Sequence, residues 1–263
     1  MRRISITPRD NAKRTLTRLL AVLFWLLAWQ ALSMIVDEEL LLVSPVSTCA
    51  ALIRLMGEGA FYRAVLGSFG RILAGFVLSS VLGIVLAALA HASQIARALL
   101  RPLMSMVKAT PVASIVILAL IWVSSRNLSI LISFLMVLPI SYSNVLDGLD
   151  RTDEKLLEMA RVFRLPLRSQ VRAIYAPAAF ASLLTAVRIS LGMCWKAGIA
   201  AEVIAQPRDS IGSALQQAKL FFLTDEMFAW TLAVILLSVL LEKLVVRLIR
   251  ALQKRTEEIA CSP

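Results

Sequence analysis

Residues that build metal and redox sites are scarce in this sequence. It contains one histidine, His91, and three cysteines, Cys49, Cys194 and Cys261, which lie far apart along the chain. A tetrahedral zinc site needs four clustered ligands, and a disulfide framework needs regularly spaced cysteines. Neither pattern is present, so we expect ordinary thiols, an interfacial histidine, and neither a metal nor another cofactor.

The sequence also lacks the signatures of several kinds of enzyme and carrier. No GxxxxGK[ST] phosphate loop occurs, so we do not expect the chain to hydrolyse ATP itself. A membrane enzyme would need a cluster of histidines, cysteines or paired acids, and none is present. A secondary transporter driven by an ion gradient typically carries carboxylates at mid-membrane. Apart from Glu242 at the end of the last apolar segment, Glu202 is the only acidic residue within one.

Apolar residues are what the chain has in excess. They make up 59% of its 263 residues, and the mean hydropathy is +0.80, whereas soluble domains are about 45–50% apolar. The net charge is +11. The lysines and arginines lie between apolar runs, where they set membrane orientation rather than bind nucleic acid. The composition therefore predicts an all-α protein of the lipid bilayer.

Long uncharged runs predict six transmembrane helices. A bilayer core about 30 Å thick needs roughly 20 residues at 1.5 Å rise each. The first run, Leu19–Val36, has 18 uncharged residues and no clear small-x-small cleavage site after it, so we expect a retained span rather than a signal peptide. The predicted spans are 19–36, 72–90, 103–124, 127–146, 178–203 and 227–246.

The distribution of positive charge predicts the orientation of these spans. With the N-terminus inside, the inner segments hold 19 lysines and arginines and the outer segments hold 6. Cytoplasmic loops carry the excess of these residues, so we expect both termini in the cytoplasm. The resulting layout is a cytoplasmic segment at 1–18, a single transmembrane domain at 19–249 and a cytoplasmic tail at 250–263.

Two further patterns concern packing and the outer surface. Gly75, Ser79 and Gly83 recur every four residues in the second span, a spacing that lets two helix backbones approach closely in lipid. The alternative is that glycine is simply common in spans. The segment 42–61 is too polar to span, and Pro45 within it is expected to break any regular element. We expect its amphipathic part, 48–56, to lie at the outer surface.

The longest inner connection, the loop 147–177, is charged but periodic. Leu156, Ala160 and Phe163 are spaced as one face of a helix, and Thr152 is the predicted N-cap. Pro166 would open a second short helix that runs to Pro177. The loop is therefore a helix-turn-helix. Either it lies on the membrane surface without a partner, or its exposed leucine and methionine, Leu157 and Met159, insert into a cleft of another protein.

The residues that follow Leu156 carry a family resemblance. The stretch LLEMARVFRLPLRSQVRAIYAPAAFASLLTAVRISLG resembles the "EAA" signature of the membrane subunits of ABC importers. Glu158, Met159 and Ala160 match its Glu-x-Ala core, and Pro177 matches its later proline. VKATPVASIVILALIW (107–122), SPVSTCAAL (44–52) and AAE (200–202) resemble the nitrate, taurine and sulfonate group of these permeases.

The resemblance implies a type I ABC importer permease in a bacterial inner membrane. Such a subunit forms the pathway for a small polar or anionic solute, such as nitrate, a sulfonate, taurine or a thiamine-precursor pyrimidine. It pairs with a second copy or a similar permease, binds two ATPase subunits through the loop, and receives solute from an extracytoplasmic binding protein. The implied docking residues are Leu157, Glu158, Met159, Ala160, Arg161, Arg164, Pro166 and Pro177.

Arg164 departs from the family pattern, which places glycine at this position. Glycine would allow a left-handed turn between the two helices at little steric cost, whereas arginine in that conformation costs about 1 kcal/mol. Either the turn uses another geometry or the strain is tolerated. Our hypothesis is that Arg164 faces acidic residues of the partner.

The fifth predicted span carries charged residues that suggest a pathway. Arg188 and Lys196 are eight residues apart, so they fall within about 80° of each other on a helix. A cationic lining formed by these residues, with Glu202 nearby, would suit an anionic substrate. The other interpretation is structural: Arg188 pairs with a carboxylate of another helix, and Lys196 and Glu202 lie near the outer interface.

Overall fold

The computed structural model describes the backbone of residues 8–260 and the side chains of residues 16, 17 and 19–247. Every regular element within this range is a helix, which confirms the predicted all-α fold. The chain divides into two compact units, Met1–Glu58 with Gln217–Ala233 (unit 1) and Gly59–Gln216 with Val234–Pro263 (unit 2). The elements are α1 (Pro8–Val36), α2 (Pro45–Met56), α3 (Gly59–Ala92), α4 (Gln94–Ala109), α5 (Val112–Ala119), α6 (Ser125–Asp150), α7 (Glu154–Val162), α8 (Leu167–Gln170), the π-helix η1 (Val171–Tyr175), α9 (Ala176–Ala205), α10 (Ile211–Leu220) and α11 (Thr224–Ala260).

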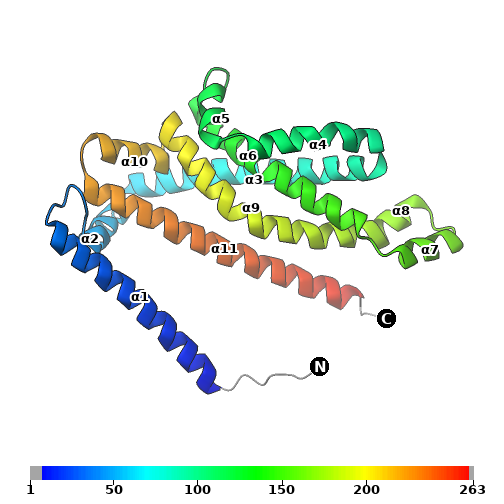
Figure 1. Ribbon diagram of the computed structural model, residues 1–263, viewed down its shortest axis with the longest axis horizontal. Coiled ribbons are helices and arrows are strands. Elements are labelled where there is room, and N and C mark those ends of the chain that lie inside the picture. The colour runs from blue at the N-terminus through cyan, green and yellow to red at the C-terminus, as the bar shows by residue number, and fades with distance from the viewer. Residues whose placement is uncertain (1–7, 261–263) are drawn as a thin grey trace. The chain divides into compact units, whose positions relative to one another are not determined.

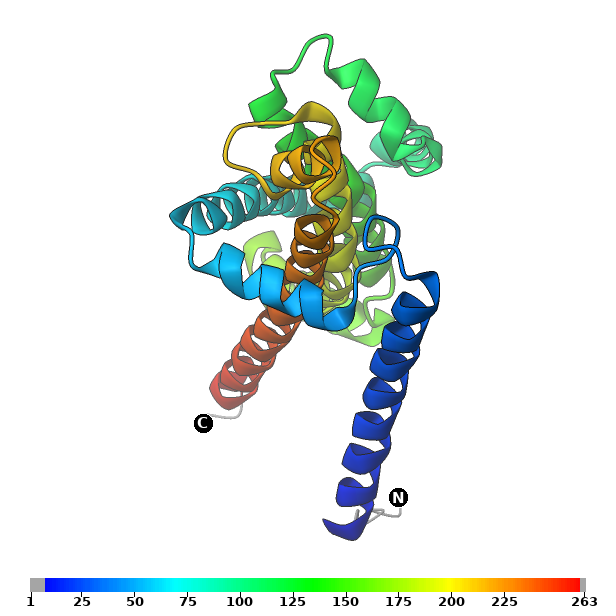
Figure 2. The same ribbon diagram turned by 90° about the vertical axis from the view of Figure 1, so that its left-hand side faces the viewer.

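In unit 1, a short loop joins α1 to α2 (Figure 2). The indole Nε1 of Trp29 donates to the carbonyl of Val43 at 3.1 Å, and this fixes the loop against α1. Ser44 caps α2 by accepting from the backbone N–H of Ser47, and Pro45 is the first residue of the helix. The expectation that Pro45 breaks regular structure was wrong, because a first-turn N–H has no partner within the helix and its loss costs nothing.

In unit 2, α3, α6 and α9 pack side by side (Figure 1). Small residues bring two of these helices into close contact. A Cβ atom at Gly75 would overlap the carbonyl oxygen of Ile130, and one at Gly83 would lie 2.7 Å from the Cβ atom of Ser141. Ser79, one turn from each glycine, is fully buried. The predicted close-packing face of the second span is therefore confirmed, and its partner is α6.

The described residues contain five helical segments that are long and apolar enough to cross a bilayer, and a bent pair of helices adds a sixth. The 12-residue α2 is too short to be one of them, as predicted for the segment 42–61. The five segments overlap the first, second, fourth, fifth and sixth predicted spans, and they are Leu19–Val36, Gly59–Ala92, Ser125–Asp150, Leu167–Ala205 and Thr224–Arg247.

The third predicted span, 103–124, is broken. The axes of α4 and α5 differ by 98°, and the break lies at Thr110 and Pro111. Proline has no backbone N–H and disfavours the helical conformation of the preceding residue. Thr110 is accordingly extended, with φ −78° and ψ 128°. The prediction of one continuous helix was wrong, because it did not take into account that Pro111 interrupts a helix.

The predicted end segments, 1–18 and 250–263, lie partly outside the described residues. Within the described range, α1 already begins at Pro8 and α11 runs to Ala260, so both helices extend beyond the predicted span limits. Cys261 lies outside that range. Of the other two cysteines, Cys49 is exposed and Cys194 is buried, and both are free thiols.

Candidate functional site

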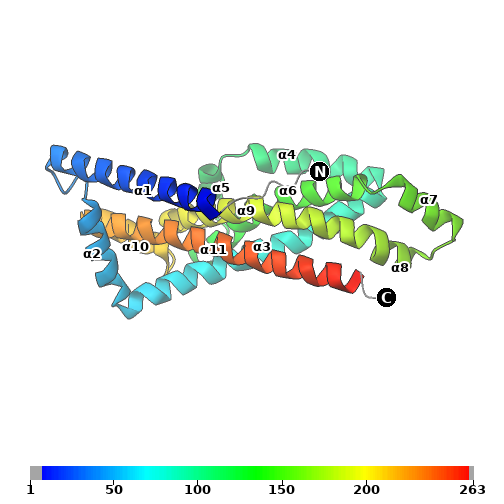
Figure 3. The same ribbon diagram turned by 90° about the horizontal axis from the view of Figure 1, so that it is seen from below.

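The segment between α6 and α9 folds as a helical hairpin at one end of the α3–α6–α9 bundle (Figure 3). We call residues 151–175 the α7–α8 loop. The side chain of Asp153 caps α7 by accepting from the backbone N–H of Lys155 at 2.9 Å. The prediction that Thr152 is the N-cap was wrong. Its hydroxyl instead donates to the carbonyl of Leu149 at 2.8 Å. Glu154 follows in the first turn, where a carboxylate is favoured by the helix dipole.

The turn after α7 has left-handed geometry at Arg164, where φ is +49°. The backbone N–H of Leu165 donates to the carbonyl of Ala160 at 2.9 Å, and that of Arg164 donates to Arg161 at 3.0 Å. These two bonds form the Schellman motif, which usually has glycine at the left-handed position. The two predicted alternatives were another turn geometry and a tolerated strain at Arg164. The structure has the strained left-handed arginine, at a cost of about 1 kcal/mol.

The second half of the hairpin runs into α9 without a gap. Pro166 precedes α8 as its N-cap, and the side chain of Gln170 donates to the carbonyl of Leu165 at 2.8 Å, which closes the turn. The π-helix η1 follows, in which Ala176 N–H donates to Val171 O. This five-residue spacing adjusts the register just before Pro177, which has no N–H to continue the ladder.

The outer face of the hairpin is apolar and exposed. Val162 and Phe163 are 79% and 71% exposed, and Met159 is 45% exposed. Leu156, which is 42% exposed, lies about one turn before Met159 on the same side of α7. We call these four residues the α7 stripe. Because a charged loop in water gains nothing from displaying large apolar side chains, such a stripe is typical of a surface that a partner covers.

The predicted docking residues have different positions in the hairpin. Met159 belongs to the stripe, whereas Leu157 is half-buried and Ala160 is 1% exposed and packed inward. The helix predicted from the spacing of Leu156, Ala160 and Phe163 is present as α7 with Phe163 as its C-cap, and of these three residues only Ala160 is buried. The remaining predicted docking residues all have exposed side chains, and they are Glu158, Arg161, Arg164, Pro166 and Pro177. Sequence periodicity did not identify Val162, and it did not show that Phe163 is exposed, because it cannot tell which face of a nine-residue helix is buried.

A polar cluster joins three helices at the end of the bundle beside the hairpin. Asp150 at the end of α6 lies 2.8 Å from Nδ1 of His91 and accepts from Arg97 Nη2 at 2.7 Å. The His91 ring also contacts Tyr175 of η1, with centroids 5.4 Å apart. Because these residues come from α3, α4, α6 and η1, the cluster connects the root of the α7–α8 loop to the bundle.

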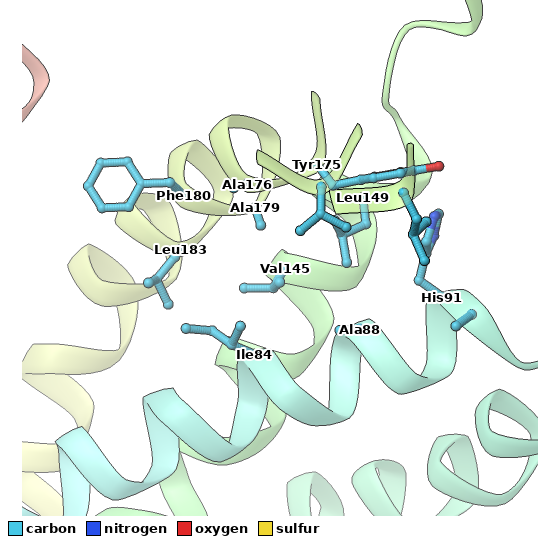
Figure 4. A pocket seen from close by; sticks show the side chains of 13 residues that line it. Ile84, Ala88, His91, Val145, Leu149, Tyr175, Ala176, Ala179, Phe180 and Leu183 are labelled. Atoms are coloured by element: carbon cyan, nitrogen blue, oxygen red, sulfur yellow. The ribbon is translucent and has the colours of Figure 1, made fainter. Parts of the chain in front are cut away.

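Next to this cluster, α3, α6 and α9 enclose an apolar hollow of about 690 Å³. Figure 4 shows Ile84, Val145 and Leu183 pointing into it, with the rings of His91 and Tyr175 at its edge. Val171 and Tyr175 of η1 line this hollow together with the bundle, and Tyr175 also packs against the bundle core.

The three predicted pathway residues do not lie together. Arg188 and Lys196 are both exposed on α9. Glu202 is fully buried, and it accepts from Arg71 Nε at 3.0 Å and from the hydroxyl of Ser68 at 2.5 Å. No local pattern in the sequence predicts this pairing, because Arg71 and Glu202 are 131 residues apart. The geometry gives Glu202 a structural role between α3 and α9 and leaves the two cations accessible.

Comparison with known proteins agrees with this architecture. The sequence matches the family described as "Binding-protein-dependent transport system inner membrane component" over residues 79–258. It is also similar to the putative aliphatic sulfonates transport permease protein SsuC of Bacillus subtilis (strain 168). The identity is 28% over 204 residues, which cover 76% of this chain and 73% of the relative.

Two other relatives are named for different substrates. The taurine transport system permease protein TauC of Escherichia coli (strain K12) is 26% identical over 233 residues, 86% of this chain and 83% of the relative. The bicarbonate transport system permease protein CmpB of Synechococcus elongatus is 25% identical over 158 residues, 60% of this chain and 56% of the relative. Because the family match spans more than half of the sequence, including the α7–α8 loop, this chain belongs to the family of inner membrane components of binding-protein-dependent transport systems, the permeases of ABC transporters.

Proposed function

We propose that this chain forms the translocation pathway of an ABC importer and is driven through the α7–α8 loop by a separate ATPase. The α7 stripe is the observation that carries the proposal. Met159, Val162 and Phe163 are exposed on a helix whose neighbours are charged, and such a helix fits an apolar groove of a partner. Family membership favours an ATPase as that partner. It also favours an ATP-driven importer over the alternative, a secondary transporter driven by an ion gradient.

The proposed assembly follows from the loop and from the charge distribution. With 19 lysines and arginines in the inner segments and 6 in the outer ones, both termini and the α7–α8 loop lie in the cytoplasm. Two copies of the chain each present one loop to one of two ATPase subunits. Closure of the ATPases then rocks α3, α6 and α9 as a rigid body, because these helices are closely packed. An extracytoplasmic binding protein delivers the solute to the opposite face.

The proposed solute is small and anionic. SsuC, TauC and CmpB are named for aliphatic sulfonates, taurine and bicarbonate, and each of these solutes carries an oxyanion group. Exposed cations on α9, Arg188 and Lys196, are consistent with such a solute. Family membership thus supports the permease role. The solutes of the three relatives and the exposed cations of α9 support an anionic solute.

The docking role is tested by making the α7 stripe polar. We expect the double variant Met159→Ser, Phe163→Ser to reach the membrane and to lose co-purification with the ATPase, because each serine removes apolar area from the interface. The matched control is Val46→Ser on α2, a residue that is 71% exposed and is expected on the outer side. ATPase retained by the stripe variant at the level of the control would contradict the assignment.

A further inference from the structure

The break between α4 and α5 opens a hollow of about 520 Å³ in unit 2. Residues 107–112 form one wall of this hollow, two turns of α6 around Pro139 form another, and Ile189 and Met193 of α9 complete it. Pro111, where the chain turns by 98°, is one of the residues that line it.

Lys108 is the charged residue of the hollow. Its Nζ atom donates to the hydroxyl of Ser143 at 2.9 Å, and that hydroxyl donates to the carbonyl of Pro139 at 2.7 Å. Among the side chains that the structure describes, no carboxylate lies within 4.0 Å of this ammonium group. An ammonium group has three N–H donors, so at least one remains for a ligand.

Two more cations lie on α9, the helix that completes the hollow. Arg188 and Lys196 lie on the exposed side of α9, as do Ile189 and Met193, which line the hollow. At 100° per residue these four positions fall within about 140° of one another. Neither Arg188 nor Lys196 forms an ion pair with a described side chain. The two are about 12 Å apart along the helix, at 1.5 Å per residue.

The position of these charges in the sequence sets them apart from the other cations. The inner and outer segments hold 19 and 6 of the 28 lysines and arginines, which leaves three. The three are Lys108, Arg188 and Lys196, all within predicted spans. An unpaired cation costs several kcal/mol in lipid and therefore faces water or a protein cavity. Lys108 lines the hollow, and Lys196 falls within about 20° of Ile189 on α9, so we expect this hollow to hold water.

We propose that Lys108, held by Ser143, is an anion-binding site inside the membrane, and that Arg188 and Lys196 extend it as a cationic path along α9. Its ligand is a small oxyanion with a sulfonate, nitrate or carboxylate-like group, which the ammonium of Lys108 binds by a charge-assisted hydrogen bond. The inference rests on the proposed permease function and adds the residue that selects for negative charge.

Transport by the assembled complex tests this site. The permease, its ATPase and its binding protein are reconstituted in vesicles and supplied in turn with labelled taurine, ethanesulfonate, nitrate and bicarbonate. For an anion that the wild type transports, we expect Lys108→Met to lower transport at sub-saturating concentration by about tenfold or more, the loss expected when a charge-assisted hydrogen bond is removed. Arg101→Met, on the same helix but outside the hollow, is expected to transport as the wild type does.

A chemical rescue separates charge from folding. In a chain whose other cysteines are replaced, Lys108→Cys is treated with aminoethyl methanethiosulfonate, which restores an ammonium group, or with the neutral methyl reagent. We expect only the aminoethyl reagent to restore transport. Equal transport after both reagents, or wild-type transport by Lys108→Met, would overturn the site. So would a wild-type complex that binds its ATPase and transports none of the four anions. Failure to bind the ATPase would instead contradict the proposed function.

Discussion

Arg71 Nε lies 3.0 Å from Glu202 Oε1, and the glutamate side chain is completely buried. The second carboxylate oxygen accepts from Ser68 at 2.5 Å, and Arg71 also donates to the carbonyl of Asp209 at 2.9 Å. Ser68 Oγ in turn accepts from the backbone N–H of Ile211 at 2.9 Å. These bonds tie α3 to α9 and to the turn before α10, so the buried pair fixes the end of unit 2 that lies away from the α7–α8 loop.

Replacing Glu202 with alanine is expected to destabilise the protein strongly. The change leaves Arg71, whose side chain is 13% exposed, without its carboxylate, and removal of one partner from a buried ion pair costs roughly 3–5 kcal/mol. We expect a lower thermal unfolding temperature in detergent and less folded protein by size-exclusion chromatography. The double variant Arg71→Met, Glu202→Met removes both charges and is expected to recover part of the loss.

An exposed ion pair nearby provides the control for this variant. Arg63 Nε lies 3.6 Å from Asp209, and both side chains are more than half exposed. Exposed pairs contribute about 1 kcal/mol at most, so Arg63→Ala should unfold close to the wild-type temperature. If Glu202→Ala were as mild as Arg63→Ala, the buried pair would not stabilise the fold.

Arg164→Gly tests the strained turn and the function of its side chain together. Glycine adopts φ near +49° without a steric penalty, so we expect the stability to rise by up to about 1 kcal/mol. If Arg164 faces acidic residues of the partner, as we hypothesise, the variant also binds the ATPase more weakly, because it removes that charge. Binding measured at low and high salt should differ less for the variant than for the wild type. Unchanged assembly and transport would rule out the charge contact.

The sequence predicted the helix-turn-helix of the loop because its apolar spacing and Pro166 are local signals. It did not predict the break at Pro111, since spans tolerate proline when neighbouring helices compensate, and sequence alone does not show whether they do. Nor did it predict the Arg71–Glu202 pair, which joins residues far apart in the chain. The exposure of the stripe residues Val162 and Phe163 was not predicted, because the buried face of a short helix is set by tertiary packing and not by periodicity.

Asp150→Ala is expected to weaken the connection between ATP hydrolysis and transport. Asp150 is the shared partner of His91 and Arg97, so its loss detaches the root of the α7–α8 loop from α3 and α4. The α7 stripe stays intact, and the ATPase should still bind. We expect less solute transported per ATP hydrolysed in proteoliposomes. Asp147→Ala makes the same change three residues earlier on α6, at an exposed carboxylate, and an equal loss there would show that the cluster has no special role.

Two glycines of α3 test how closely its backbone approaches α6. A Cβ atom at Gly75 would overlap Ile130 O and lie 2.9 Å from the Cβ atom of Ser133, whereas one at Gly70 would meet nothing within 4 Å. Gly75→Ala forces two backbones apart and is expected to cost about 1–3 kcal/mol, as overpacking does. Gly70→Ala should be neutral or stabilising by up to about 1 kcal/mol, because alanine favours the helix. Both are compared by thermal unfolding in detergent. Equal stability of the two variants would mean that α3 and α6 can separate at Gly75 without cost, and the rigid-body movement proposed for the bundle would lose its basis.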